Sequence, residues 1–174
     1  MNEIPSRNEA FIHYLESLAS GQNRGALAAL RRGLGQPPGT AAEMYPYVIP
    51  WLGDEPPAWR ERAYYLTAAL FAFHPSSTRE GNLGNAFAHC RDPQGNNDAL
   101  ERRFTNLLSA HPDDLAMYLQ QAISFLKSKE IPVNWQQLLD DLQSWGHPER
   151  YVQRRWAQAF WGRPAKPLEE QNQS

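Results

Sequence analysis

Arginines are the residues of this sequence whose type and spacing best suit a chemical role, and that role is the binding of anions. The candidate set comprises three adjacent pairs and two single residues: Arg31, Arg32, Arg60, Arg102, Arg103, Arg150, Arg154 and Arg155. A guanidinium group stays charged, offers a planar fork of donors that matches a phosphate, and stacks on bases. The pairs form either solvated helix faces, with partners such as Glu101 and Glu149, or one basic stripe along a sugar–phosphate backbone. Spacing alone leaves both alternatives open.

The overall charge does not by itself indicate a nucleic-acid-binding protein. The chain has 174 residues and a formal net charge of −2, so phosphate binding would require basic residues gathered on one face. Of its 17 basic residues only Lys127, Lys129 and Lys166 are lysines. The excess of arginine suits phosphate forks, although a genome of high GC content would also favour arginine codons.

Sequence motifs of the common enzyme classes are absent. We find no Gly-rich phosphate loop, no His-Glu-x-x-His and no Gly-x-Ser-x-Gly. Three of the five histidines precede a proline, which is typical of helix boundaries: His74, His111 and His147. Cys90 is the single cysteine, which excludes an internal disulfide and a multi-cysteine zinc site and suits a reducing compartment.

Two acidic pairs leave a metal-dependent nuclease as a weaker alternative. Asp113-Asp114 and Asp140-Asp141 could hold a divalent cation, but no further acids follow at ligand spacing. We interpret the first pair as a helix start and the second as a solvated helix face. We therefore expect no enzyme activity, no cofactor and no metal. The sequence also lacks a secretory signal and a membrane-spanning stretch, so we expect a cytoplasmic protein.

Apolar periodicity predicts that helices carry all of these residues. In the first half we expect helices over 8–19 and 23–34, and a short helix or turn over 41–52, where two prolines interrupt the pattern. Residues 58–73 are apolar on nearly every side, which is typical of a central helix. Residues 75–82 are polar and are predicted to form a loop.

The second half shows the same pattern with clearer boundaries. We expect helices over 83–90, from Asp98 with Glu101 as a capping box, from Pro112, from Asn134 to Gly146, and from Pro148. The last of these would place Arg150 and Arg154 on one helical face. Lys127 and Lys129 would complement the dipole at the end of the helix that begins at Pro112.

The fold class predicted from these elements is all-α, with eight or nine helices in a two-lobed helical bundle. Residues 1–75 would form an N-terminal lobe, residues 82–161 a C-terminal lobe, and residues 162–174 a flexible tail.

Several of these segments, in this order, resemble the CasB family, the small subunit of the type I-E CRISPR Cascade complex. The segments are Ala-Leu-Arg-Arg at 29–32, the Tyr-to-Trp stretch at 45–51, Asn-Leu-Gly-Asn-Ala-Phe-Ala at 82–88, Glu-Arg-Arg-Phe at 101–104, Asn-Trp to Trp-Gly at 134–146, and Glu149-Arg150. Arg31, Arg32, Arg102, Arg103 and Arg150 match basic positions of the family pattern, whereas Arg154 and Arg155 have no clear counterpart. The chain departs from it at Ser109 and Gln120-Gln121, where relatives can carry arginines.

The resemblance implies a non-catalytic, all-helical subunit of a CRISPR RNA-guided complex in antiviral defence. Its partners would be the CRISPR RNA, the target and non-target DNA, and the other Cascade subunits, with a second copy forming a pair within the complex. A basic groove would stabilise the R-loop, while base pairing reads the sequence. The alternative is an architectural helical adaptor whose arginines dock on acidic protein partners.

Overall fold

The chain folds into helices joined by short loops. The computed structural model describes residues 3–162, and in that range it contains nine α-helices, one 3₁₀-helix and no strand. The elements are α1 (Arg7–Ser20), α2 (Arg24–Arg31), η1 (Ala42–Met44), α3 (Tyr45–Leu52), α4 (Ala58–Phe73), α5 (Leu83–Ala88), α6 (Asp98–Leu108), α7 (Leu115–Ser128), α8 (Trp135–Gln143) and α9 (Tyr151–Trp161). The predicted all-α class with eight or nine helices is confirmed. The predicted tail, apart from Gly162, lies outside the described residues.

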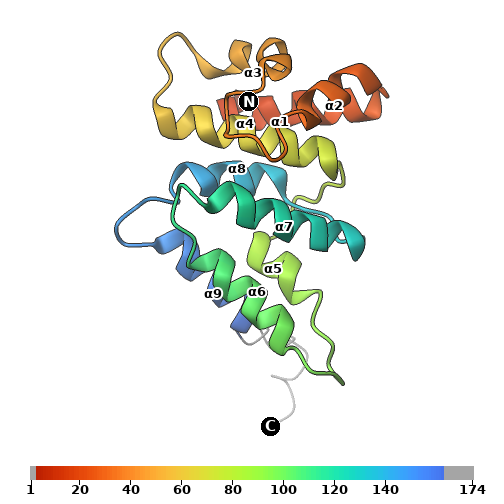
Figure 1. Cartoon of the computed structure of the whole chain (residues 1–174), viewed down its shortest axis with the longest axis vertical. Helices are drawn as coiled ribbons and strands as arrows, with labels where there is room; N and C mark the ends of the chain where they lie inside the picture. The colour runs from red at the N-terminus through yellow and green to blue at the C-terminus, as the bar shows by residue number, and fades with distance from the viewer. Residues whose placement is uncertain (1–2, 163–174) are drawn as a thin grey trace.

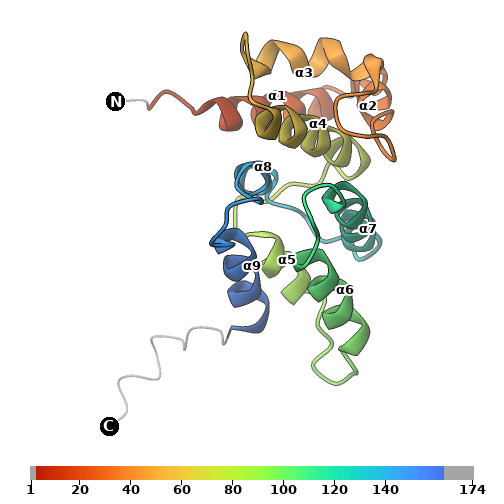
Figure 2. The ribbon, with the colours of Figure 1, turned by 60° about the vertical axis from the view of Figure 1, so that its left-hand side comes forward.

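Helices α7 and α8 lie between two groups of helices. Figure 1 shows α1–α4 together at one end of the molecule, and α5, α6 and α9 at the other end. Figure 2 shows α8 between α4 and α9, and α8 packs against both α1 and α4. One continuous apolar core runs through both groups. A division into lobes at residues 75–82 stays a prediction.

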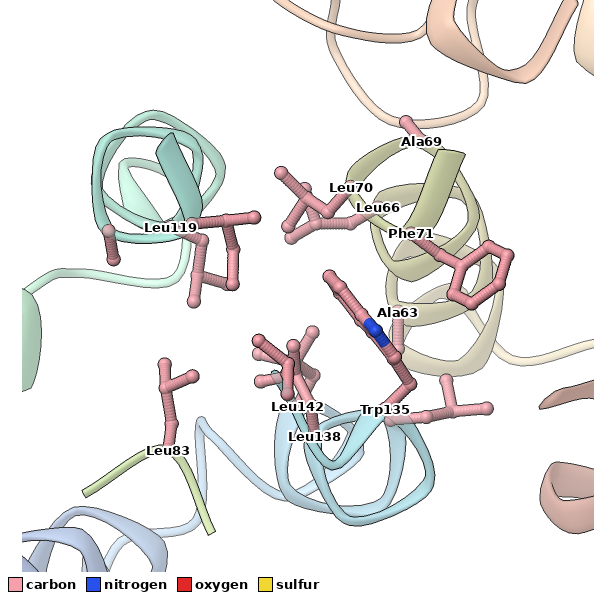
Figure 3. Packing of buried hydrophobic residues seen from close by; sticks show 14 of the residues in the cluster. Ala63, Leu66, Ala69, Leu70, Phe71, Leu83, Leu119, Trp135, Leu138 and Leu142 are labelled. Carbon is pink, nitrogen blue, oxygen red and sulfur yellow. The ribbon is translucent and has the colours of Figure 1, made fainter. Parts of the chain in front are cut away.

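Helix α4 is the central helix that its composition predicted. Ten of its 16 residues are buried, and it packs on α2, α3 and α8. Leu66 and Leu70 of α4 point into the same interior as Leu119 of α7 and Leu138 of α8 (Figure 3). The predicted range 58–73 is confirmed, since Pro57 precedes the helix and the His74-Pro75 step ends it.

Loop 75–82 is held in place by the segment that precedes α8. Val133 N–H donates to the Ser76 carbonyl at 3.0 Å, and Thr78 N–H donates to the Val133 carbonyl at 3.0 Å. The indole N–H of Trp135 donates to the same Ser76 carbonyl at 3.1 Å. The loop therefore joins α4 to α8 as well as to α5.

The predicted cap at Asn134 and the predicted start of α6 at Asp98 are confirmed, but one predicted capping box and two other predicted helix starts are wrong. The Asn134 side chain accepts from Gln137 N–H at 3.1 Å. Helix α6 has Asn97 as its N-cap and no side-chain capping bond there, so Asp98 is not the cap of a capping box. Helix α7 begins at Leu115 and α9 at Tyr151, each three residues after the predicted proline. Tight turns fill the intervening residues, and a proline permits a turn as readily as a first helical turn.

Three predicted helices are shorter than expected. Helix α5 ends at Ala88 rather than at residue 90. Helix α2 ends at Arg31 and α8 ends at Gln143, because the residues that follow form turns before Gly35 and Gly146. No helix within the described range is long and apolar enough to cross a membrane.

Candidate nucleic-acid interface

A groove with a volume of ≈ 860 Å³ lies between α7 and the loop that follows α2. Loop residues 33–38 form one wall, α7 residues from Ala116 to Ser128 form the other, and Leu66, Ala69 and Leu70 of α4 form the floor. Gly35 N–H donates to the Gln120 side-chain oxygen at 3.0 Å, which ties the loop to α7. We call this cavity the α2–α7 groove.

Arg103 lies at one end of the α2–α7 groove beside an aromatic ring. Its guanidinium carbon is 4.6 Å from the centroid of the Phe125 ring, and Lys129 Nζ is 5.9 Å from the same centroid. Both Arg103 and Phe125 line the groove. This end therefore combines two cations with the exposed part of a ring, which can bind phosphate and contact a base.

A smaller cavity of ≈ 310 Å³ extends this basic end between α6 and α7. Arg102 and Arg103 line it together with Asn106, Tyr118 and Gln121. Arg103 and Gln121 line both cavities, so the two are neighbours. The second arginine pair therefore lies on the surface that the groove opens onto, and both of its side chains are exposed.

The first arginine pair lies near the same groove, at the carboxyl end of α4. Arg31 Nη1 donates to the Ala72 carbonyl at 3.2 Å, and Lys127 Nζ donates to the Phe73 carbonyl at 3.0 Å. Two cations therefore meet at the negative end of the α4 dipole. Arg32 is exposed and immediately precedes Gly33, the first residue of the groove wall.

Lys127 and Lys129 were predicted only to complement the dipole of α7. Lys127 does lie in the last turn of α7 and Lys129 caps it. Lys127 also lies against Phe73, one residue after the Ala72 carbonyl that Arg31 contacts, and Lys129 lies beside the Phe125 ring that Arg103 contacts. No spacing rule links residues 31, 103 and 129, so only the fold could reveal this arrangement.

Arg60 does not belong to this cluster. It lies at the amino end of α4, about 12 residues and hence roughly 18 Å along the helix from the Ala72 carbonyl. Its guanidinium carbon is 5.4 Å from the Trp59 ring centroid, and its Nη1 donates to the Leu52 carbonyl at 3.4 Å. Burial raises the pKa of the neighbouring Tyr64 hydroxyl to about 12, although the charges of Arg7 and Arg60 lower it.

Arg150, Arg154 and Arg155 lie away from the groove, around the start of α9. The prediction that Arg150 and Arg154 share a helical face is wrong, because Arg150 precedes the helix in the left-handed conformation, with φ 51°. Arg150 Nη2 donates to the Leu108 carbonyl at 2.6 Å, and the Arg155 guanidinium carbon is 4.9 Å from the Tyr151 ring centroid. Helix α9 packs chiefly on α5.

Residues 26–161 match the family model of the CRISPR-associated protein Cse2. This chain belongs to the Cse2 family. The Cse2 protein of Thermus thermophilus is 37% identical over 175 residues, an alignment that covers 97% of this chain and 98% of that protein. The predicted resemblance to the CasB family is therefore confirmed.

Solved structures agree with this assignment. The crystal structure of CasB from Thermus thermophilus has a TM-score of 0.80 and 35% identity, and covers 91% of this chain and 100% of that chain. A chain of a CRISPR RNA-guided surveillance complex has a TM-score of 0.76 and 30% identity, and covers 88% of this chain and 91% of that chain. CasB from Thermobifida fusca, at 20% identity and a TM-score of 0.74, shares the fold.

The acidic pairs of this Cse2-family chain lie in different surroundings. Asp113 and Asp114 precede α7, and Asp113 lies at the α2–α7 groove opposite Arg62, at 4.0 Å. The prediction that Asp140 and Asp141 form a solvated face is wrong for Asp141, which is buried. No group of three or more His, Cys, Asp or Glu that could hold a metal ion occurs within residues 3–162.

Buried Asp141 accepts two hydrogen bonds from other side chains. The indole N–H of Trp156 donates to it at 2.7 Å and the Gln137 side-chain amide at 2.9 Å. Burial raises the pKa of the Asp141 carboxyl group, and the two hydrogen bonds oppose that rise. This carboxylate joins α8 to α9 and has a structural role.

Proposed function

We propose that this chain is a non-catalytic small subunit of a CRISPR RNA-guided surveillance complex. Its membership of the Cse2 family supports this, as does its likeness to a chain of such a complex at 30% identity over 88% of its length. Its partners would be the CRISPR RNA, the target and non-target DNA strands, the other Cascade subunits and a second copy of itself.

We propose further that the α2–α7 groove binds a sugar–phosphate backbone and so stabilises the R-loop. The observation that carries this proposal is that Arg103 and Lys129 both lie beside the ring of Phe125, which lines the groove with Arg103, while Arg31 and Lys127 donate to neighbouring carbonyls at the end of α4. Side chains from three helices supply these four cations. Neighbouring cations neutralise successive phosphates and release counterions, which makes binding favourable and independent of sequence.

The charges along the groove suggest where the strand would run. Arg103 and Asp113 are the charged residues among those that line it, and Asp113 faces Arg62 at 4.0 Å. Asp113 would repel a phosphate, whereas Arg102 and Arg103 extend the basic end onto α6. We therefore place the strand over the α6–α7 end and the carboxyl end of α4, away from Asp113.

The adaptor alternative suits the arginines outside the groove. Arg60 lies at the opposite end of α4 from the carbonyl that Arg31 contacts, Arg150 reaches the Leu108 carbonyl of α6, and Arg154 and Arg155 lie on α9, which packs on α5. We assign these four a structural or protein-docking role. The candidate nucleic-acid set thereby narrows to Arg31, Arg32, Arg102 and Arg103, with Lys127 and Lys129 added.

Binding of single-stranded DNA tests this division of the arginines. Fluorescence anisotropy would compare the wild type with Arg31→Ala/Arg32→Ala and Arg102→Ala/Arg103→Ala at about 50 and about 200 mM salt. The matched control is Arg154→Ala/Arg155→Ala, which removes an equal charge from α9. Each phosphate contact contributes a slope of about −0.7 in log affinity against log salt for a single strand. The rise from about 50 to about 200 mM salt weakens binding by a certain factor in each protein. Because each groove variant lacks two phosphate contacts, this factor should be about seven times smaller for the variant than for the wild type.

The control decides how the result is interpreted. We expect Arg154→Ala/Arg155→Ala to bind as the wild type does at both salt concentrations. If all three double variants weaken binding equally, the protein has only a diffuse electrostatic attraction for DNA and the groove is not the site. If none of them changes binding, the adaptor alternative is favoured.

A further inference from the structure

A second cavity, outside the proposed nucleic-acid path, opens between α4 and the loop that joins α8 to α9. Its volume is ≈ 360 Å³. Most of its wall is apolar and comes from Trp59, Leu66, Leu115, Leu142 and Trp145. Figure 3 shows Leu66 of α4 and Leu142 of α8 pointing into one interior, and both residues line this cavity. We call it the Trp59 cavity.

Hydrogen bonds hold the far wall of the Trp59 cavity in place. The indole N–H of Trp145 donates to the Ala110 carbonyl at 3.1 Å, and the Gln153 side-chain amide donates to the Trp145 carbonyl at 2.9 Å. The Trp145 ring also packs on Trp156, with centroids 5.0 Å apart. Buried hydrogen bonds and ring packing fix this wall before any ligand binds. Binding therefore does not have to order these side chains, and its entropy cost is lower.

The rim carries an exposed ring and a weakly paired cation. Trp59 is 51% exposed. Arg62 is 4.0 Å from Asp113, and their side chains are 47% and 74% exposed. An ion pair with such a long distance and such exposed side chains contributes little to stability. Arg62 can therefore leave Asp113 and pair with an incoming carboxylate.

We propose that the Trp59 cavity docks a partner-protein segment in which a large apolar side chain lies next to a carboxylate. The apolar side chain enters between Trp59 and Trp145, and the carboxylate pairs with Arg62. Tryptophan and arginine around an apolar pocket are the residues that dominate binding energy at protein interfaces. Among the residues that line the cavity, Arg62 is the only basic residue other than histidine, and there is no aspartate or glutamate. Its positive charge favours an acidic segment. A nucleic-acid strand would need several cations here.

This inference rests on the proposed function for the source of the partner, which is a neighbouring subunit of the surveillance complex. It assigns Arg62 and the Trp59 cavity to protein contact, while Arg102 and Arg103 contact nucleic acid. The two surfaces can therefore be disabled independently.

Gly146 allows the Trp59 cavity to be filled without changing the rest of the fold. It lines the cavity and has no left-handed φ, and a Cβ added to it would first meet Pro112 Cγ, at an ordinary 3.9 Å. Gly146→Leu should therefore fill the cavity from its loop wall. Arg62→Glu removes the cation, with Arg24→Glu as an exposed control on α2. Trp59→Ala is matched by Ile49→Ala, because Ile49 is also 51% exposed.

The test uses two blocked tripeptides, Asp-Trp-Asp and Lys-Trp-Lys, titrated into the full ¹⁵N-labelled chain. We expect the acidic peptide to shift the indole N–H signals of Trp59 and Trp145. Reversing the charge at Arg62 should weaken binding about fivefold or more, as expected for loss of an exposed ion pair and addition of a repulsion. Gly146→Leu should abolish the shift at Trp145, and the Arg24 and Ile49 variants should bind as the wild type does.

Three results would overturn the docking site. They are no shift with the acidic peptide, equal binding of both peptides, and unchanged binding by Gly146→Leu. Single-stranded DNA binding separates this outcome from failure of the proposed function. Variants of the Trp59 cavity should bind DNA as the wild type does. If the groove variants also keep wild-type DNA binding, the proposed function fails while the docking site stands.

Discussion

Asp141 shows how one buried carboxylate can join two helices. It lies on α8, one residue after exposed Asp140, and receives hydrogen bonds from Trp156 of α9 and Gln137 of its own helix. Two donors stabilise the ionised form, but burial disfavours it more strongly, so the pKa of the carboxyl group is raised. Proton uptake by Asp141 is therefore coupled to folding.

This coupling predicts a specific pH dependence of stability. A carboxyl group whose pKa is higher in the folded than in the unfolded state binds its proton more tightly when folded. The stability of the wild type relative to Asp141→Asn should fall as pH rises from the ordinary value of 3.8 through the folded-state pKa, and then stay level. Urea unfolding of both proteins across this pH range measures the difference. A difference that grows with rising pH would show that the two donors outweigh burial.

The sequence could not predict the burial of Asp141. It adjoins Asp140 in the chain, and its Trp156 partner is 15 residues away. The sequence could not predict the position of Lys129 either, because Lys129 and Arg103 are brought together only by lying beside the same ring, that of Phe125. Both residues of each arginine pair are exposed, as both alternatives for the pairs required. The sequence could not predict which pairs would meet.

Helix α5 depends on a glycine at its contact with α9. Gly84 is buried, and a Cβ added there would clash with the Trp156 backbone carbonyl. Helices α5 and α9 can approach each other this closely only because residue 84 has no side chain. The Leu-Gly step of segment 82–88, which contributed to the resemblance, therefore has a packing reason.

Replacing this glycine should destabilise the protein. We expect Gly84→Ala to lower the free energy of unfolding by about 1–3 kcal/mol, as extra volume in a packed core usually does. The matched control is Gly25→Ala on α2, where the added Cβ meets only the Asn23 side chain, at 3.9 Å. An exposed helical glycine should gain up to about 1 kcal/mol from the same change. Equal effects at the two sites in urea unfolding would contradict the close α5–α9 contact.

At the scale of elements, apolar periodicity was more reliable than the residues that mark helix ends. The range of α4 was predicted correctly because ten buried residues dominate the pattern. The starts of α7 and α9 were wrong because Pro112 and Pro148 open turns before the helices begin. The error at α9 also misplaced Arg150, whose side chain ends at the Leu108 carbonyl of α6 rather than beside Arg154.

At the scale of the whole molecule, the two proposed functions lie on different surfaces. Residues 33–38 after α2 and side chains of α6 and α7 line the proposed nucleic-acid path, and the amino-terminal half of α4 with the α8–α9 loop forms most of the proposed protein-docking cavity. Helix α4 contributes to both, since Leu66 lines each of them. A net charge of −2 conceals this arrangement, because overall composition does not show where the charges lie.

The lifetime of the R-loop in the assembled surveillance complex is the measurement that tests the central claim most directly. The complex would be reconstituted with the wild-type chain, with the combined Arg31, Arg32, Arg102 and Arg103 alanine variant, or with Arg154→Ala/Arg155→Ala. We predict that the quadruple alanine variant joins the complex but shortens the R-loop half-life about tenfold or more. Each hydrogen bond from a charged group contributes about 1.5–3 kcal/mol to the stability of the bound state. The α9 control should keep the wild-type half-life. A wild-type half-life with the quadruple alanine variant would contradict the claim that the α2–α7 groove stabilises the R-loop.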